Sequence, residues 1–518
     1  MNLDPEGFWR LAAAQPDRVA LIEPDGTAVT RGELLIRTNR LSHGLRAAGL
    51  QPGSTVTAML PNSSDYLALV FATGQIGLRL VPLDSQLTAS ELTYLISDSG
   101  ASIFVASKRF AQSASEAADA AGLTDRQRFA PAPFGGFAGL DQLTAEMPDT
   151  APENRLTGQI MHYTSGTTGV PKGVRRPMRI GRPDPIAGYL SWALRKRFGL
   201  PIGTGVHLVT APMHHAAAGG FAAQSLHMGQ QLVLMDRFDA AESLRLIDRH
   251  RVTNTSVTPI MMHRWLKLPS EIRDSVQVSS LQHVLHGGAP CPIDTKRRML
   301  DWLGPILHEY YSFSEGGMVS VGSLDWLKHP GTVGRPEPGS VRVLGKDGTA
   351  RMPGETGLVY LKLPDLLRFE YLGDPEKTAA AIRDGYCTAG DLGHVDNEGW
   401  LYIDDRRADL IISGGVNIYP AEIEAVLVQH PAVSDAAVVG VPDDEWGTSA
   451  VALVELAPDA MAGEGTAADI LAAAGLRLAR HKLPKSIEFV PTVGRRPDGK
   501  LRRHFLRSAY LAAKEIPS

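Results

Sequence analysis

The sequence has little cysteine and no excess of basic residues. Cys291 and Cys387 are the two cysteines among 518 residues, too few for a disulfide framework and typical of a reducing compartment. Lys and Arg number 52 against 56 Asp and Glu, so the net charge is −4. This balance argues against a nucleic-acid-binding protein, whose surface usually carries a basic excess. We expect a cytoplasmic protein without a nucleic-acid partner.

Long apolar runs are also absent. The most apolar window, residues 66–83, is interrupted by Gln75 and Arg79, so we expect no membrane span. The first 18 residues carry acidic side chains early and lack the basic segment and apolar run of a signal peptide. A hydrophobic fraction of 43% is that of an ordinary globular protein with a sizeable core.

Strand and helix patterns alternate through much of the chain. The alternation over residues 55–106 and again over 205–311 predicts parallel, doubly wound sheets, which makes the fold class α/β. Residues 331–400 are rich in strand patterns and turn signals such as Asp347-Gly348, which predicts a small antiparallel barrel or distorted sheet. Residues 125–155 are rich in proline, glycine and polar residues, and we expect them to cross the surface without regular structure.

A composition break at residues 404–409 suggests a domain boundary. We predict a large N-terminal domain over 1–405, which contains both α/β units and the β-rich part. A hinge at 406–409 follows, and then a small, mobile α+β lid domain over 410–518.

The most informative stretch is residues 163–174, which read YTSGTTGVPKGV. It combines four aliphatic hydroxyls, three glycines and Lys172. Glycine lets a backbone approach a ligand closely, successive N–H groups can form an anion-binding nest, and lysine adds a compact charge. The stretch therefore predicts a polyphosphate-binding loop, although it lacks the spacing of a Walker A motif. The alternative is a flexible surface loop.

Residues 175–185 hold four arginines and three prolines. A solvated basic loop and a phosphate-contacting loop are the two interpretations that their composition leaves open.

The loop is one of seven spaced motifs that resemble the adenylate-forming (ANL) superfamily, which includes acyl- and aryl-CoA synthetases, peptide-synthetase adenylation domains and luciferases. The other six are Pro212-Met213-His214-His215, Gly287-Gly288-Ala289-Pro290, Tyr311 to Glu315, Gly390-Asp391, Asp405-Arg406 and Asp498-Gly499-Lys500. The resemblance covers nearly the whole chain in the right order. Residues 175–315 look most like actinobacterial ligases for fatty, steroid or bile acids, and a terpenoid-acid ligase of platensimycin-type biosynthesis is our narrower guess.

The resemblance implies a site for ATP and Mg²⁺. Glu315 matches the metal ligand of the family, and Ser314 replaces its usual threonine. Lys500 matches the lysine that bridges carboxylate and α-phosphate oxygens and stabilises the transition state. The resemblance implies further residues that contact ATP. Those at the phosphates are Thr164, Ser165, Gly166, Thr167, Thr168, Gly169 and Lys172. Those at the adenine are Gly287, Gly288, Ala289 and Tyr311, and those at the ribose are Asp391 and Arg406.

The resemblance also implies coenzyme A as a substrate. Gly414 and Gly415 would let its pantetheine arm pass close to the backbone. Lys485 matches a residue that contacts a CoA phosphate in related aryl-CoA ligases, and a solvated lysine is the alternative. His215 would gate the acyl pocket. The small residues 216–220 behind His215 leave volume for a bulky hydrophobic acid.

The expected reaction is that of an AMP-forming acid–CoA ligase with domain alternation, working in secondary metabolism: acid, ATP and CoA give acyl-CoA, AMP and pyrophosphate. Ala408 stands at a hinge position that is usually Lys or Asp, and Phe313 is bulky beside the nucleotide. These departures keep open a partial enzyme that only thioesterifies an adenylate supplied by a separate partner enzyme. An acyl loader for a carrier protein and an inactive nucleotide-binding protein are the other readings, and homodimers are common in the family.

Overall fold

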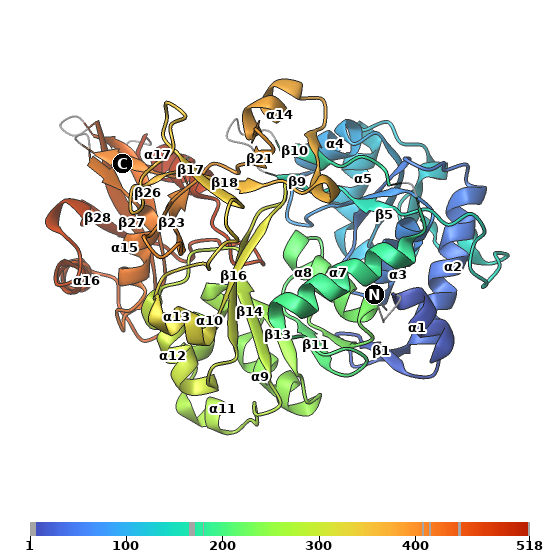
Figure 1. Cartoon of the computed structure of the whole chain (residues 1–518), viewed down its shortest axis with the longest axis horizontal. Helices are drawn as coiled ribbons and strands as arrows, with labels where there is room; N and C mark the ends of the chain where they lie inside the picture. Colours follow the sequence, from blue (N-terminus) through green and yellow to red (C-terminus); the bar gives the residue numbers. More distant parts are fainter. Residues whose placement is uncertain are drawn as a thin grey trace.

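A computed structural model describes residues 7–164, 171–179, 181–406, 409–413, 416–443 and 447–515. The side chains of Asp405, Arg406, Ile412, Val416, Asn417 and Glu515 are not described. Figure 1 shows a large N-terminal part and a smaller C-terminal domain, drawn in orange and red at one end of the molecule. The fold is mixed α/β, as the alternating patterns predict.

The first sheet has six strands, and each neighbouring pair in it is parallel. Its order is β7 (Ala138–Gly139), β6 (Arg128–Ala130), β5 (Ala101–Ala106), β3 (Thr55–Met59), β4 (Arg79–Pro82) and β8 (Gln159–Ile160). The helix α2 (Arg31–Ala47) precedes β3 in the chain. The helices between these strands are α3 (Ser64–Gln75), α4 (Ala89–Asp98), α5 (Ala111–Ala120) and α6 (Asp141–Thr144), with short 3₁₀ turns at Lys108–Phe110 and Asp125–Gln127. The expectation of an irregular segment over 125–155 is wrong, because the short strands β6 and β7 and the helix α6 lie within it.

The second sheet has eight strands, parallel except for its two edge pairs, β15–β16 and β1–β2. Its order is β16 (Met318–Gly322), β15 (Leu307–Ser312), β14 (His283–Gly287), β13 (Asn254–Val257), β11 (Val206–Val209), β12 (Gln231–Leu234), β1 (Val19–Ile22) and β2 (Ala28–Thr30). Its helices are α1 (Phe8–Ala14), α7 (Pro183–Phe198), α8 (Ala216–His227), α9 (Ala240–Arg249), α10 (Pro259–Lys267), α11 (Ser270–Asp274), α12 (Ile293–Leu303) and α13 (Ser323–Lys328).

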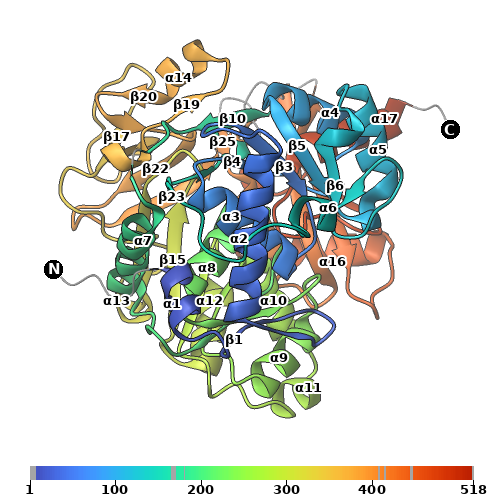
Figure 2. The ribbon, with the colours of Figure 1, turned by 90° about the vertical axis from the view of Figure 1, so that its right-hand side faces the viewer.

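One apolar core joins these two sheets. It includes Val56 of β3, Phe71 of α3 and Leu232 of β12, all buried. Figure 2, which faces the N-terminal part, shows α2 in front of the first sheet and the C-terminal domain behind it. Among the described helices, none is both long and apolar enough to cross a membrane.

The β-rich part is antiparallel, as its turn signals predict. Its strands are β17 (Val341–Leu344), β18 (Gly357–Lys362), β20 (Ile382–Arg383), β21 (Tyr386–Cys387), β22 (Asp391–Val395) and β23 (Leu401–Arg406), with α14 (Pro375–Ala381) and a 3₁₀ turn at Asp365–Leu367. A separate small sheet pairs β19 (Glu370–Tyr371) with β10 (Lys172–Arg175), and β10 with β9 (Tyr163–Thr164).

The C-terminal domain folds around an antiparallel pair of long strands, β26 (Val433–Asp443) and β27 (Gly447–Leu456). The strand β28 (Ser486–Phe489) lies parallel to β27. The other elements are β24 (Ile411–Ser413), β25 (Val416–Ile418), α15 (Pro420–Leu427), α16 (Glu464–Gly475), α17 (Arg503–Glu515) and a 3₁₀ turn at Arg480–Lys482.

Candidate active site

A cleft of about 3380 Å³ extends between the N-terminal part and the C-terminal domain. Segments far apart in the sequence line it, including the end of β14, the end of β15 and the turn that carries Lys500. The residues with a predicted role that line this cleft are Thr164, His215, Gly287, Gly288, Ala289, Tyr311, Ser314, Glu315, Asp391 and Lys500. The structure thus brings together side chains that are as many as 336 positions apart in the chain (from Thr164 to Lys500).

The floor of the cleft is formed where two parallel strands end. Gly287 of β14 lies opposite Tyr310 of β15, so the loops that follow these strands begin side by side. A Cβ atom on Gly287 would lie 2.4 Å from the carbonyl oxygen of Tyr310, which explains why glycine is needed here. Ligands of open α/β sheets usually bind outside the carboxyl ends of the strands.

Tyr311 and Asp391 meet across two sheets. The Oη of Tyr311 donates a hydrogen bond to Oδ2 of Asp391 at 2.7 Å. Asp391 begins β22, and its side chain is buried. This bond fixes the aromatic ring predicted at the adenine and the carboxylate predicted at the ribose in one arrangement.

Glu315 is buried and accepts hydrogen bonds from two hydroxyls on one carboxylate oxygen. Tyr371 Oη donates at 2.7 Å and Thr164 Oγ1 at 3.4 Å. Burial and the neighbouring Glu315 carboxylate raise the pKa of Tyr371, so its phenol stays protonated and keeps donating. Lys377 lies over the Tyr371 ring, 4.3 Å from its centroid. Sequence reasoning missed Tyr371, since a lone tyrosine in a β-rich segment carries no motif.

The segment around Glu315 is held from behind by Arg176. Its guanidinium donates to the carbonyl oxygens of Ser314 at 2.7 Å and Glu315 at 3.2 Å, and also to that of Leu367. Its neighbour Arg175 pairs with Glu370. Neither interpretation of the basic stretch at 175–185, a solvated loop or a phosphate-contacting loop, describes Arg176, because its guanidinium binds backbone oxygens. The helix α7 also begins within it, at Pro183.

Two paired strands, β9 and β10, flank the predicted phosphate loop in the sequence. Lys172 of β10 is opposite Thr164 of β9, and its Nζ is 3.9 Å from Oδ2 of Asp374. Ser165, Gly166, Thr167, Thr168 and Gly169 lie outside the described residues.

Lys500 sits on a tight turn of the C-terminal domain. The N–H of Arg496 donates to the Lys500 carbonyl at 3.0 Å, and the N–H of Gly499 donates to the Arg496 carbonyl at 2.8 Å. A Cβ atom on Gly288 would lie 3.4 Å from Lys500 Cε, so the lysine stem passes directly over the Gly287–Pro290 loop. The Nζ of Lys500 is 3.6 Å from Oδ2 of Asp498.

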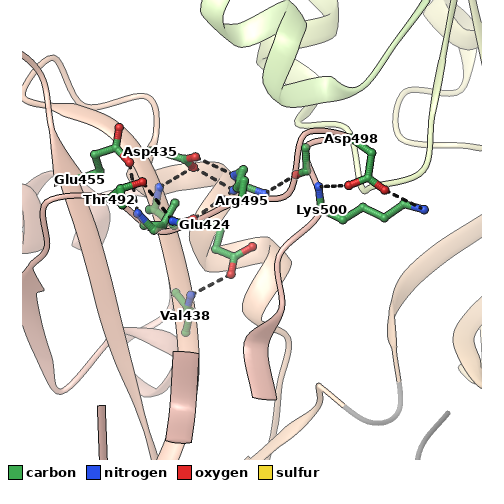
Figure 3. A network of polar contacts seen from close by, with 12 residues as sticks. Glu424, Asp435, Val438, Glu455, Thr492, Arg495, Asp498 and Lys500 are labelled. Carbon is green, nitrogen blue, oxygen red and sulfur yellow. Dashed lines mark hydrogen bonds and ion pairs between the residues drawn. The ribbon is translucent and has the colours of Figure 1, made fainter. Parts of the chain in front are cut away.

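Arg495 fixes this turn to the C-terminal domain. It binds both carboxylate oxygens of Asp435, at 2.7 and 2.8 Å, and donates to the Gly499 carbonyl at 3.1 Å. Figure 3 shows Arg495 between Asp435 and the turn, with Asp498 and Lys500 at the end of the loop that faces the N-terminal part. Bidentate arginine–carboxylate pairs hold geometry as well as charge. Sequence reasoning also missed Arg495, whose partner is 60 positions away.

Three histidines lie together beside the turn. The rings of His214 and His215 are 4.1 Å apart, and His215 Nδ1 is 3.3 Å from Asp498 Oδ2. Burial lowers the pKa of His215, and burial with nearby cationic groups lowers that of His162 to about 4. All three are therefore neutral at pH 7, since burial lowers the pKa of His214 as well. His215 directly precedes α8, whose first residues line the cleft.

Several other predicted residues do not reach this cluster. Lys485 contacts Asp443 at 2.7 Å within the C-terminal domain and does not line the cleft. The side chain of Arg406 is not described, and Ala408, Gly414 and Gly415 lie outside the described residues.

Phe313 lines the cleft and packs on apolar neighbours. Its ring centroid is 5.9 Å from that of Tyr311, and it adjoins the cluster that contains Phe369 and Tyr371.

Comparison with known proteins gives consistent matches over nearly the whole chain. The AMP-binding enzyme family matches residues 8–369, and the AMP-binding enzyme C-terminal domain matches residues 422–500. A feruloyl-CoA synthase of Amycolatopsis sp is 36% identical, over 96% of this chain and 99% of the relative. A long-chain-fatty-acid–CoA ligase of Mycobacterium tuberculosis is 32% identical, over 97% of this chain and 98% of the relative.

Solved structures also match over nearly the whole chain. The o-succinylbenzoate CoA synthetase from Bacillus subtilis, in complex with its acyl-adenylate intermediate, aligns with a TM-score of 0.78 and 27% identity. The alignment covers 97% of this chain and 98% of that one.

Proposed function

The chain belongs to the AMP-binding enzymes of the adenylate-forming (ANL) superfamily, in its acyl- and aryl-CoA ligase branch, and from this premise we propose that it carries out both half-reactions of an acid–CoA ligase. In the first, an acid and ATP give an acyl-adenylate and pyrophosphate. In the second, the thiol of CoA displaces AMP. The observation that carries the proposal is the convergence of Lys500, Glu315 and Asp391 on one cleft.

The first half-reaction brings two anions together. Bringing a carboxylate oxygen about 4 Å from a phosphate oxygen costs roughly 4 kcal/mol at an effective dielectric near 20. Lys500, whose stem crosses the Gly287–Pro290 loop, offsets this repulsion with its ammonium group. As the acid oxygen attacks the α-phosphorus and pyrophosphate leaves, Lys500 stabilises the charge that develops on the transferring phosphate.

Mg²⁺ fits the same group of residues. It is usually held by one or two carboxylates together with substrate phosphates, and Glu315 supplies a buried carboxylate beside the hydroxyl of Thr164. When bound, the ion would neutralise phosphate charge. The hydrogen bond from Tyr371 fixes the orientation of the Glu315 carboxylate, which would hold the ion.

The nucleotide is held by residues from three segments. Gly287, Gly288 and Ala289 form one wall and Tyr311 the other, with the adenine between them. Asp391 accepts the ribose hydroxyls, since a carboxylate has enough lone pairs to accept them together with the Tyr311 bond. Ser314 and Lys172 contact the phosphates.

The second half-reaction requires a different orientation of the C-terminal domain. We assign residues 1–405 to the N-terminal domain, 406–409 to a hinge around Arg406, and 410–518 to the mobile lid. Rotation about the hinge withdraws Lys500 and brings Gly414 and Gly415 to the cleft. There the pantetheine arm of CoA passes between the domains, and Lys485 lies at the surface where its phosphates emerge.

A bulky hydrophobic acid suits the far part of the cleft. Ala216, Ala217, Ala218 and Gly220 line it with little side-chain volume. Apolar side chains that also line it are those of Tyr189, Trp192, Phe221 and Met318. The names of the relatives include both an aromatic and a long-chain acid. His215, which is neutral at pH 7 and is the N-cap residue of α8, would gate this region.

Pyrophosphate release tests the proposal. The protein, Mg²⁺, ATP and a panel of acids are incubated with and without CoA, and pyrophosphate and acyl-CoA are measured. Release that requires the acid, together with acyl-CoA when CoA is present, is the expected result. Lys500→Ala should lower acid-dependent release by about 10²- to 10³-fold.

Two outcomes favour the alternatives. No pyrophosphate release, with acyl-CoA formed from a supplied acyl-adenylate, would identify a thioesterification-only enzyme that depends on a partner. Transfer to a carrier protein in preference to CoA would identify an acyl loader.

A further inference from the structure

Two adjacent arginines of the Lys500 turn contact opposite domains. Arg495 binds Asp435 on β26 of its own domain. Arg496 reaches across the cleft, and its Nη2 lies 2.9 Å from Oδ2 of Asp84 in the N-terminal part. The turn between Arg496 and Lys500 is closed by two backbone hydrogen bonds, so the position of Arg496 determines where Lys500 is placed.

Asp84 follows β4 and is a buried carboxylate with several polar neighbours. From the C-terminal domain it receives Arg496 and also Arg502, whose Nη2 lies 3.5 Å from Oδ2. From its own side, the Gln86 N–H donates to Oδ1 at 3.0 Å and His214 Nε2 lies 3.5 Å from Oδ1. The Asp84 side chain is 8% exposed, against 26% for Arg496 and 28% for Arg502.

We propose that Asp84 is a positioning residue for the first half-reaction, and that it acts through Arg496 to seat Lys500 at the reacting groups. The proposal rests on the proposed function, because it needs Lys500 to act in adenylation. Asp84 is a positioning residue here because it contacts the turn rather than the acid or ATP.

The two guanidinium groups and the lysine belong to the same rotating domain. When that domain turns for thioesterification, Asp84 loses both guanidinium partners at once. A buried carboxylate left without a cationic partner is unfavourable, so the contact stabilises one orientation and not the other. Removing the charge of Asp84 should therefore slow adenylation selectively.

A second ion pair across the domains supplies a matched control. Arg477 Nη2 lies 2.5 Å from Oδ2 of Asp294, but the two side chains are 47% and 38% exposed. Solvent weakens an exposed pair, so it should contribute little to the orientation. Asp84→Asn and Asp294→Asn remove the same charge from the same side of the cleft and differ in burial.

The experiment measures each half-reaction separately. Acid-dependent exchange of pyrophosphate into ATP reports adenylation, and acyl-CoA formed from a supplied acyl-adenylate reports thioesterification. Asp84→Asn should slow the exchange by roughly tenfold or more and leave thioesterification within about twofold of the wild type. Asp294→Asn should change both by less than about threefold.

The reciprocal variant tests the route through Arg496. Arg496→Gln should reproduce the selective loss, and Asp84→Asn combined with Arg496→Gln should lose little more than either alone. Equal losses of both half-reactions in Asp84→Asn would show a merely structural role and overturn the proposal, as would unchanged exchange. Absence of exchange in the wild type would instead contradict the proposed function, which keeps the two failures apart.

Discussion

Lys296 and Glu309 form a buried ion pair beneath the nucleotide loops. The lysine is fully buried, its Nζ lies 2.6 Å from Glu309 Oε2, and it is 4.5 Å from the centroid of the Trp326 ring. Lys296 lies on α12, which follows the Gly287–Pro290 loop, and Glu309 lies on β15, two residues before Tyr311. One pair of charges therefore links the two segments that we propose as the walls of an adenine site.

Lys296→Met should destabilise the protein strongly. Removing one partner of a buried pair leaves a charge without compensation, at a cost of about 3–5 kcal/mol. Burial already raises the pKa of Glu309, so the cost is best measured at pH 8, where proton uptake relieves it least. The thermal midpoint should fall by several degrees.

The double variant Lys296→Met with Glu309→Leu supplies the control. It replaces both charges with apolar groups and should recover most of the lost stability, because no buried charge then lacks a partner. A midpoint in Lys296→Met equal to that of the wild type would contradict the assignment of this pair as a stabilising contact.

At the scale of elements, the Lys500 turn fits against α10 with no spare room. Gly499 has φ +80°, and a Cβ atom there would lie 2.4 Å from Thr258 Oγ1 and 2.6 Å from Ile260 Cγ2. Gly494 has φ +60° but nothing within 4 Å of its Cβ position. The two glycines share the backbone requirement and differ in contact with the N-terminal part.

Gly499→Ala should therefore lower adenylation more than Gly494→Ala. Both substitutions carry the strain of a positive φ, about 1–2 kcal/mol, but the alanine at 499 also prevents the turn from seating. Acid-dependent pyrophosphate exchange measures the effect, with thioesterification of a supplied adenylate as the reference. Equal exchange rates in the two variants would show that the close contact does not limit the reaction.

Some helices and strands could be predicted from the sequence and others could not. The central strands and helices of both α/β units were predictable, because each has its own apolar period and end signals. The strands β6 and β7 are 3 and 2 residues long and show no period, so only the pairing of β6 with β5 and of β7 with β6 reveals them. The turn signal Asp25-Gly26 lies between β1 and β2, but no local pattern marks the parallel pairing of β1 with β12.

The site divides in a similar way. Residues inside motifs, such as Glu315 and Lys500, could be proposed from the sequence because their neighbours in the chain mark them. Residues that act through distant partners were missed, because no local pattern marks Tyr371, Arg495 or Asp84. Their roles depend on which segments the fold brings together.

At the scale of the whole molecule, buried neutral histidines predict sensitivity to mild acid. Burial lowers the pKa of His162, His207, His263 and His308 to about 4 and that of His227 to about 3, against 6.5 for a free side chain. At pH values between the pKa of the folded side chains and that of the free side chain, the unfolded chain binds protons that the folded protein does not. Stability is therefore fully present above about pH 6.5 and is lost as the pH falls toward 4.

The thermal midpoint should thus fall steadily from pH 7 to pH 5. Differential scanning calorimetry at several pH values checks this, with ionic strength held constant. His207 bonds to Asn254 in the middle of the second sheet, and its replacement by Gln should reduce the pH dependence at some cost in stability at pH 7. A midpoint that does not change over this range would contradict neutral burial of these histidines.

The pairing of β1 with β12 also has a consequence in time. Leu21 pairs with Leu232, so the hairpin leaves the ribosome more than 200 residues before its partner strand. At about 5–20 residues per second, this separation amounts to roughly 10–40 s of synthesis. Throughout that interval the apolar side of the hairpin has no partner strand. The second sheet therefore cannot form strand by strand as the chain is synthesised, because its first two strands must wait for β12.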